Sequence, residues 1–255
     1  MSAATLTAIP ADGREARPGL ARLTLVELRK MTNTRAGFWL QLAIAALTVV
    51  IVVVIAIAGE EPDQRFREML GAAIQPASIL GPIVGVLLVS SEWSQRTAQI
   101  TFSLVPRRSR VLAAKLLAGI AWCAMAFAAS LAAAAVATAA AGAPDAWSTP
   151  GALVLQDALY VVISMLGGIA FGAALLSSAP AIVLYFVLPI AWSIVGGLKA
   201  LEGAARWLDG GRTLAPMIDG TLDGTQWARV LATVAVWIVL PLLIGLWRII
   251  RGEVR

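Results

Sequence analysis

The chain has 255 residues, of which 59% are hydrophobic and 14% charged, whereas a soluble domain is about half apolar and a quarter charged. One cysteine and no histidine exclude a disulfide within the chain and argue against a metal site built on those side chains. The pI of about 10.1 does not indicate nucleic-acid binding, because the basic residues are scattered between long apolar runs. The composition favours an integral membrane protein.

Residues 1–36 are expected to form a cytoplasmic tail that ends in an amphipathic elbow helix over 20–35. Leu20, Leu23, Leu28 and Met31 share a broad apolar face of that helix. The basic side chains around this face are expected to contact anionic lipid headgroups. They are Arg22, Arg29, Lys30 and Arg35. Residues 37–255 are expected to form one transmembrane domain.

Long charge-free windows predict the membrane spans, because a charged side chain at the bilayer centre costs about 2.5–3.5 kcal/mol. The window over 158–198 would be about 60 Å long as one helix, roughly twice the hydrocarbon core. The proline of Ser177-Ser178-Ala179-Pro180 is therefore predicted to break it into two spans. The six predicted spans cover 38–58, 72–91, 112–141, 153–176, 181–198 and 228–248.

The charges between the spans predict the orientation. Most of the basic residues fall on the side of the N-terminus, and most of the acidic residues fall on the opposite side. The positive-inside rule then places both termini in the cytoplasm. The predicted fold class is an all-α integral membrane protein with six transmembrane helices. The outer loop over 199–227 is too long for a plain hairpin and is expected to contain short helices against the outer mouth.

Small residues and prolines predict how the spans pack. The GxxxG sequences at 81–85 and 168–172 are interpreted as helix-packing faces, with a dimer seam as the alternative. Pro82, Pro189 and Pro241 fall inside spans and are expected to bend them, either as fixed shape or as hinges.

The predicted spans contain no charged residue near the middle of the bilayer. Asp157 is the nearest candidate, and its place close to the outer end of span four indicates an interfacial position. Carriers coupled to protons or ions usually need an embedded charge. This pattern argues against an ATP-independent carrier and against an intramembrane enzyme.

The inner loop over 91–111 is predicted to contain an amphipathic helix at the membrane surface. Its apolar face carries Trp93, Thr97, Ile100 and Leu104. Phe102 breaks the pattern by placing an aromatic ring on the polar side. That ring either folds back onto the next span or anchors a cytosolic partner.

Within this loop, Glu92-Trp-Ser-Gln-Arg-Thr97 and Val105-Pro-Arg-Arg-Ser-Arg110 resemble the loop after the second span of type-2 ABC transporter permeases, especially those of actinobacteria. The basic segment over 25–35 and the closing segment over 248–255 are also similar to that family. The resemblance therefore covers most of the chain.

The resemblance implies a permease subunit of the bacterial plasma membrane that forms a homodimer. A separate ATP-binding cassette subunit would carry ATP and Mg and drive export of a hydrophobic or amphipathic substrate. The chain contains no G-x-x-x-x-G-K-[ST] motif, which agrees with a partner ATPase. No catalytic residue, cofactor or metal is expected in this chain.

The family's coupling helix and its basic flank map onto the inner loop. The residues that would contact the ATPase are Glu92, Trp93, Arg96, Thr97, Phe102, Arg107, Arg108 and Arg110. An ATP-independent carrier or channel, or a membrane scaffold that transports nothing, remains the alternative.

Overall fold

The computed structural model describes residues 19–95 and 107–251, which form helices and no strand. Six helical segments are long and apolar enough to cross a membrane, so the six-span prediction is confirmed. The first five are α2 (Arg35–Ala58), α3 (Phe66–Ser94), α5 (Arg108–Ala141), α6 (Gly151–Leu175) and α7 (Ser178–Val195). The sixth runs through α11 (Gly224–Val234), the π-helical turn η1 (Ala235–Val239) and α12 (Leu240–Arg251).

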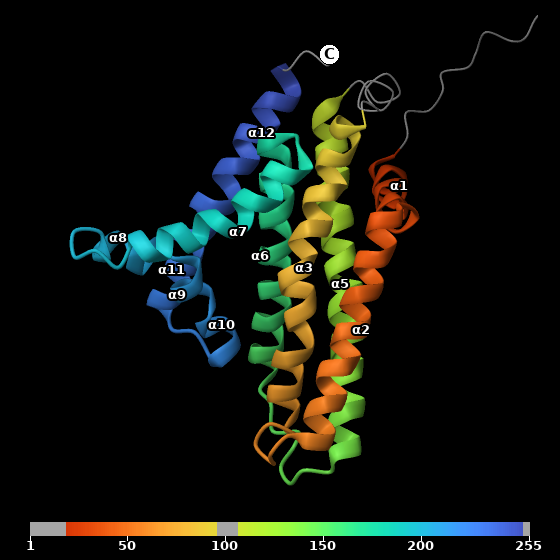
Figure 1. The fold of residues 1–255 in the computed structure, drawn as a ribbon, viewed down its shortest axis with the longest axis vertical. Coiled ribbons are helices and arrows are strands. Elements are labelled where there is room, and N and C mark those ends of the chain that lie inside the picture. The colour runs from red at the N-terminus through yellow and green to blue at the C-terminus, as the bar shows by residue number, and fades with distance from the viewer. Residues whose placement is uncertain (1–18, 96–106, 252–255) are drawn as a thin grey trace, which may run out of the picture.

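The spans form an elongated bundle with two distinct ends (Figure 1). The amphipathic helix α1 (Leu20–Asn33) and the end of α12 lie at one end, which we call the terminal end. The turns over 59–65 and 142–150 lie at the other, which we call the hairpin end. The terminal end thus collects both ends of the described chain. The cytoplasmic orientation of this end stays a prediction.

A capped corner joins α1 to the first span. Thr34 is extended, and its hydroxyl accepts a hydrogen bond from the Gly37 amide at 3.1 Å. This is an N-cap, which satisfies one of the free amides at the start of α2. A Cβ at Gly37 would clash with the Met31 carbonyl oxygen, so the tight corner requires glycine. The predicted elbow helix is thus present and distinct from span one.

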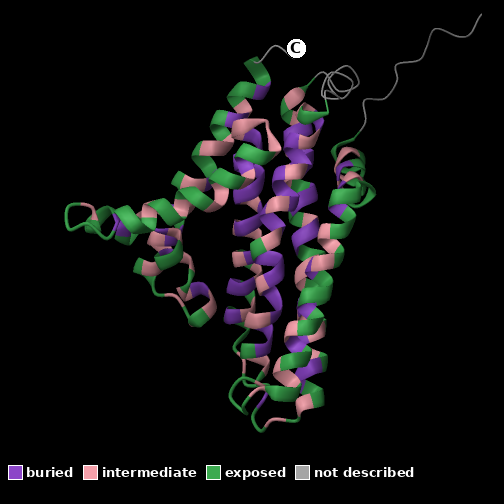
Figure 2. Cartoon of the chain, in the orientation of Figure 1, coloured by how far each residue is buried: buried purple, intermediate pink, exposed green. Residues whose placement is uncertain are grey.

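The core lies where α3 and α6 pack side by side (Figures 1 and 2). A Cβ at Gly168 would clash with the carbonyl oxygen of Pro82, and one at Gly172 would lie 3.0 Å from the Val86 Cα. From the other side, a Cβ at Gly85 would lie 2.8 Å from the Met165 carbonyl oxygen. Gly85, Gly168 and Gly172 thus belong to the α3–α6 contact, whereas Gly81 lies against Trp122 of α5, and the interpretation of both GxxxG sequences as packing faces within the chain is confirmed.

The outer surfaces of the bundle are apolar, as a bilayer requires. Figure 2 shows buried residues concentrated on α3 and α6, whereas α7 and much of α2 are exposed. The exposed side chains on α2 and α7 are mainly valine, isoleucine and leucine, with Val54 55% and Ile194 73% exposed. Large apolar side chains facing outward along whole helices are typical of lipid-facing or protein-covered surfaces.

The fold-back between spans four and five begins earlier than predicted. Leu176 adopts a left-handed conformation with φ of 53°, and Ser177 is extended. Pro180 lies inside the first turn of α7 instead of at the break. The first-turn amides of a helix have no partner within it, so the missing proline N–H costs nothing there.

Pro241 is accommodated by a local change of helix type. A proline at 241 has no N–H to donate to the Trp237 carbonyl. In a regular α-helix the proline ring would also clash with that carbonyl. The preceding residues form the π-turn η1, in which the Leu240 amide donates to the Ala235 carbonyl. The wider turn makes room for the ring, as π-bulges do elsewhere. The expected disturbance at Pro241 is therefore a π-turn.

The predicted outer loop contains three short helices: α8 (Glu202–Leu208), α9 (Gly210–Leu214) and α10 (Pro216–Asp219). They lie beside the bundle, because α7 and α11 lean away from α6, and the segment around α10 reaches Arg67 and Gln156 near the starts of α3 and α6 (Figure 1). The prediction of short helices is confirmed, whereas their position against an outer mouth stays a prediction.

A single glycine-to-alanine substitution, which adds one methyl group, tests the α3–α6 contact. Gly168→Ala would overpack this contact, which typically costs about 1–3 kcal/mol, so we expect a melting temperature several degrees lower. Gly151→Ala, in the same helix but with no atom near the new Cβ, is the control. Unfolding is measured in detergent as reaction of a thiol dye with the single cysteine, Cys123, which is 1% exposed. Equal melting of both variants would contradict the assignment.

Candidate functional site

Four charged side chains meet at the terminal end of the bundle and form what we call the ionic cluster. Glu27 and Lys30 come from α1, Glu92 from the last turn of α3 and Lys115 from near the start of α5. The Lys30 Nζ lies 2.6 Å from Glu27 and 2.7 Å from Glu92. The Lys115 Nζ lies 2.6 Å from Glu27 and 3.2 Å from Glu92. Each ammonium therefore bridges both carboxylates.

The cluster is largely buried and carries no net charge. Glu27, Glu92 and Lys115 are at most 8% exposed, and Lys115 also donates to the Leu88 carbonyl at 2.9 Å. Burial by itself lowers the pKa of Lys30, but its hydrogen bonds with Glu27 and Glu92 outweigh burial and raise that pKa above its usual value. Lys30 is thus protonated at neutral pH. Because an unpaired buried charge costs several kcal/mol, the four groups hold α1 against α3 and α5.

The structure describes five of the predicted ATPase contacts, all at the terminal end. The Glu92 carboxylate is turned into the ionic cluster, and Trp93 packs against the core. Arg108 donates to the Ile249 carbonyl of α12 at 2.7 Å. Arg107 is exposed and Arg110 is partly exposed. Direct contact of these residues with an ATPase stays a prediction. Arg96, Thr97 and Phe102 lie outside the described residues.

The predicted membrane contacts divide into two groups. Arg22, Arg29 and Arg35 are exposed on α1 and at the start of α2, as contact with lipid headgroups requires. Lys30 instead turns inward to the ionic cluster. The helical wheel could not separate them, because the partner of Lys30 on α3 is 62 residues away.

The ionic cluster predicts how the elbow responds to mutation. Lys115→Met leaves two buried carboxylates with one ammonium, and removing one partner of a buried pair costs about 3–5 kcal/mol. We expect α1 to detach and trypsin to cleave after its exposed Arg29 at least tenfold faster. Lys115→Arg, which keeps the charge, and Lys199→Met, which removes an exposed lysine from the 199–227 segment, serve as controls. Unchanged cleavage in Lys115→Met would show that the cluster does not hold α1.

A second polar group, which we call the side clamp, holds α10 and the residues after it against the bundle. Arg67 of α3 pairs with Asp157 of α6 and donates to the Ile218 carbonyl. The Gln156 amide donates to the Gly220 carbonyl at 2.8 Å and accepts from the Leu222 amide at 3.2 Å. Irregular backbone beside apolar spans needs such partners, because lipid supplies none.

The interfacial position of Asp157 stays a prediction, but the side clamp shows that its side chain is part of an ion pair inside the protein. Its side chain is fully buried inside the protein and pairs with Arg67, which is 90 residues away in the chain. The polar pair Gln156-Asp157 in an otherwise apolar run was the signal available in the sequence. Its partners could not be identified there, because they lie on α3 and in the 217–222 segment.

Removing Gln156 should loosen this segment. Gln156→Leu deletes its hydrogen bonds to the segment, each worth about 1 kcal/mol. We expect the Leu222 amide to exchange with deuterium at least tenfold faster, measured by hydrogen exchange and mass spectrometry. Gln64→Leu, which loses only bonds to the Ala56 and Gly59 carbonyls at the hairpin end, is the control. Equal exchange in both variants would mean that Gln156 does not hold the segment.

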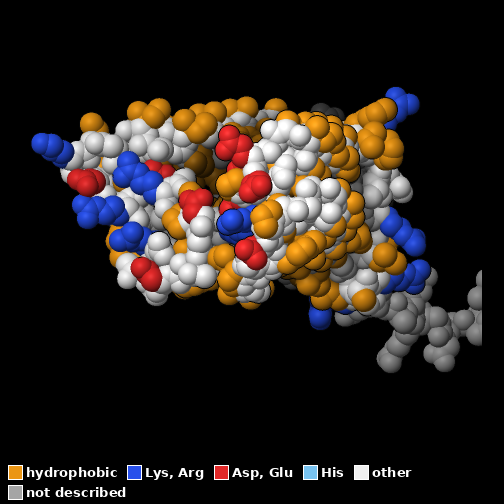
Figure 3. All heavy atoms as spheres, turned by 90° about the horizontal axis from the view of Figure 1, so that it is seen from below, with side chains coloured by type: hydrophobic (Ala, Val, Ile, Leu, Met, Phe, Trp, Pro, Cys, Tyr) orange, Lys and Arg blue, Asp and Glu red, His pale blue; other side chains and the backbone are white. Residues whose placement is uncertain are grey.

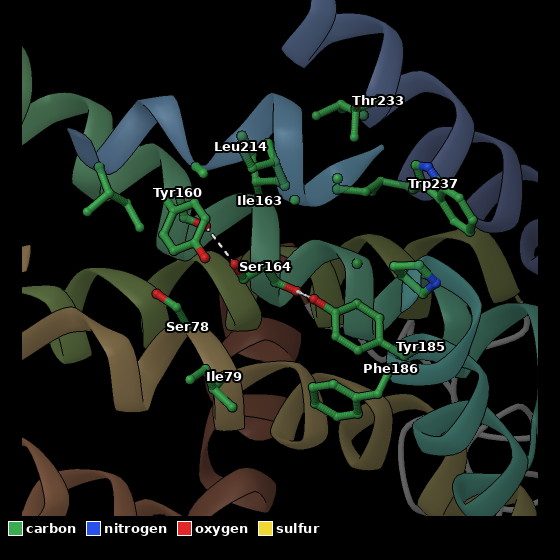
Figure 4. Close-up of a pocket in the computed structure, with 18 of the residues that line it drawn as sticks. Ser78, Ile79, Tyr160, Ile163, Ser164, Tyr185, Phe186, Leu214, Thr233 and Trp237 are labelled. Atoms are coloured by element: carbon green, nitrogen blue, oxygen red, sulfur yellow. Dashed lines mark hydrogen bonds between the residues drawn. The ribbon is translucent and has the colours of Figure 1, made fainter. Parts of the chain in front are cut away.

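Between the bundle and the leaning helices lies a cavity of about 570 Å³. Its walls come from α3, α6, α7, α9, α10, α11 and η1 (Figure 4). Tyr160, Ser164 and Ser78 bring their hydroxyls together at one side of it. Tyr185 crosses toward α6 and donates to the Ser164 carbonyl at 3.3 Å. The sequence prediction missed this cavity entirely, since its lining is assembled from five separate stretches of chain.

The two ends of the bundle differ in their charged groups. Seen from the hairpin end, acidic and basic side chains gather on the molecule's end while hydrophobic side chains cover its flanks (Figure 3). The terminal end carries the ionic cluster and the exposed arginines of α1.

Within residues 19–95 and 107–251, no group of three or more His, Cys, Asp or Glu side chains is suited to hold a metal ion.

No protein-family model matches the chain, and no curated protein is significantly similar to it. The resemblance to type-2 ABC permeases therefore stays an expectation from the residues quoted above. Independently of that resemblance, the structure contains six helices long and apolar enough to cross a membrane and three sites: the ionic cluster, the side clamp and the cavity.

Proposed function

We propose that the chain is the permease subunit of an ATP-binding cassette exporter and works with a separate ATPase subunit. In this proposal the terminal end faces the cytoplasm of a bacterium, and the segment over 91–111 receives the ATPase. The observation that carries the proposal is the ionic cluster. It joins the elbow helix to both helices that flank this segment, so a force applied there reaches three elements at once.

The contacts around the cluster support a path for that force. Lys115 and Glu92 couple the two ends of the flanked segment, and Arg108 connects the start of α5 to Ile249 of α12. Beyond the cluster, α3 continues into its glycine contact with α6. We therefore infer that α3, α5 and α6 move as one body with α12, which packs on α6 at Gly245, whereas α7 and α11 are free to change their tilt.

The homodimer in this proposal is supported by an apolar stripe on α7. Val183, Val187, Ile190 and Ile194 follow a spacing of four, three and four residues and are 51–73% exposed. This is the spacing of a helix–helix seam in a coiled coil. A second copy related by a two-fold axis would cover the stripe and enclose a pathway between the two chains.

The proposal is tested at the segment that receives the ATPase. Phe102→Ala and Arg96→Glu are expected to reduce the cassette ATPase recovered with the affinity-purified chain at least tenfold, as loss of an interface hot spot does. Membrane insertion should be unchanged. Recovery is measured by quantitative mass spectrometry of complexes from the native membrane. Lys199→Glu, which reverses an exposed charge outside this segment, is the control.

Three outcomes would overturn the proposal. Normal recovery of the ATPase with both variants would show that the 91–111 segment does not bind the ATPase. If cysteines introduced at 92–105 react with a reagent applied outside intact cells, the segment faces the exterior and the proposed orientation is wrong. Transport by the purified chain in liposomes without any ATPase would favour the ATP-independent carrier.

A further inference from the structure

The cavity beside α6 has the size and lining of a small-molecule site. Ligand pockets in proteins range from about 300 to 1,000 Å³ and are mostly apolar with a few polar groups, and this cavity measures about 570 Å³. The chain has only two tyrosines, Tyr160 and Tyr185, and both line it. Phe171, Phe186 and Trp237 complete its aromatic walls. Such walls favour flat or bulky apolar groups.

Two polar groups in the lining have no partner in the described chain. The hydroxyls of Ser164 and Ser78 donate to the carbonyls of Tyr160 and Ile74, and Tyr185 donates to Ser164. The Tyr160 hydroxyl and the Gln75 amide make no hydrogen bond with any described residue. Figure 4 shows the Tyr160 hydroxyl pointing toward the space beside Ser78 and Ser164.

The charges around the cavity decide what class of ligand fits. Of the residues that line it, only Asp219 is charged, and Asp219 is an exposed residue of α10. No lysine or arginine lines it, so an anion would find no counter-charge. A buried ion without a partner is strongly disfavoured. An anion is therefore excluded, and a cation would find only the solvent-exposed Asp219 carboxylate, so the lining fits an uncharged ligand best.

We propose that this cavity binds one uncharged amphipathic small molecule within a single chain. Its apolar body lies against Phe171, Phe186 and Trp237, and its carbonyl or hydroxyl oxygen accepts from Tyr160. A lipid acyl chain fits less well, because it would leave the Tyr160 hydroxyl and the Gln75 amide unpaired. The binding site does not depend on an ATPase, whereas its role as the exporter's substrate site rests on the proposed function.

The position of the site explains why the side clamp matters. Ile218 lines the cavity, and its carbonyl accepts from Arg67. Leu214 and Ala215, just before it, line the cavity as well. The clamp thus holds one wall of the cavity in place.

Benzophenone is a suitable probe, because it has two uncharged aromatic rings, one carbonyl acceptor and a photoreaction that marks nearby C–H groups. The purified chain in lipid nanodiscs is irradiated with increasing benzophenone, and labelled peptides are quantified by mass spectrometry. We expect saturable labelling of Ile163 and Phe186. Half-saturation should require about fivefold more benzophenone in Tyr160→Phe, the loss expected for one hydrogen bond.

The controls separate binding from partition into the bilayer. Ser130→Ala loses a hydroxyl that bonds to the Ala73 carbonyl and does not line the cavity, so its half-saturation should match the parent chain. Ser164→Phe fills the cavity and should abolish saturable labelling, while reaction of Cys123 on heating verifies that each variant is folded. Labelling that never saturates, or that is the same in Tyr160→Phe, would overturn the proposal. So would saturable labelling of these residues by a phospholipid with a photoreactive acyl chain that benzophenone does not displace.

Discussion

The close approach of α3 and α6 is the constraint on which the rest of the structure depends. Lipid gives helices no hydrophobic reason to associate, so their contact relies on van der Waals packing between backbones. Gly85, Gly168 and Gly172 allow that approach, because a side chain at any of them would meet backbone atoms of the facing helix. Two further helices pack on α6 at a glycine of their own: α5 at Gly119 and α12 at Gly245.

Polar groups are confined to places where the protein itself can satisfy them. The ionic cluster lies at the terminal end, and the side clamp lies where α10 meets α6. Between them the α3–α6 contact is apolar, whereas α7 and α11 lean away and leave the cavity. The molecule therefore combines a tightly packed half with a loosely packed half. Under the proposed function, the first transmits force and the second changes shape around a substrate.

The hydropathy pattern predicted the number and order of the spans but not where each begins. Helix α3 starts at Phe66, before the predicted 72, and α5 starts at Arg108, before the predicted 112. Helix α3 extends back past Arg67, which pairs with the buried Asp157, and α5 begins with Arg108, which donates to the Ile249 carbonyl of α12. A charge-free window treats every charge as a helix boundary, so it shortens a span whose charge is paired.

The sequence by itself determined that the chain is helical, that it has six membrane-compatible spans, and that glycines at 81–85 and 168–172 form packing faces. These properties are local, since they follow from the hydrophobicity and size of neighbouring residues. Only the tertiary structure decided that the two glycine faces meet each other, that Glu27 and Lys115 pair across 88 residues, and that both tyrosines face one cavity. Such pairings depend on which helices become neighbours, and a linear pattern of hydrophobicity contains no information about that choice.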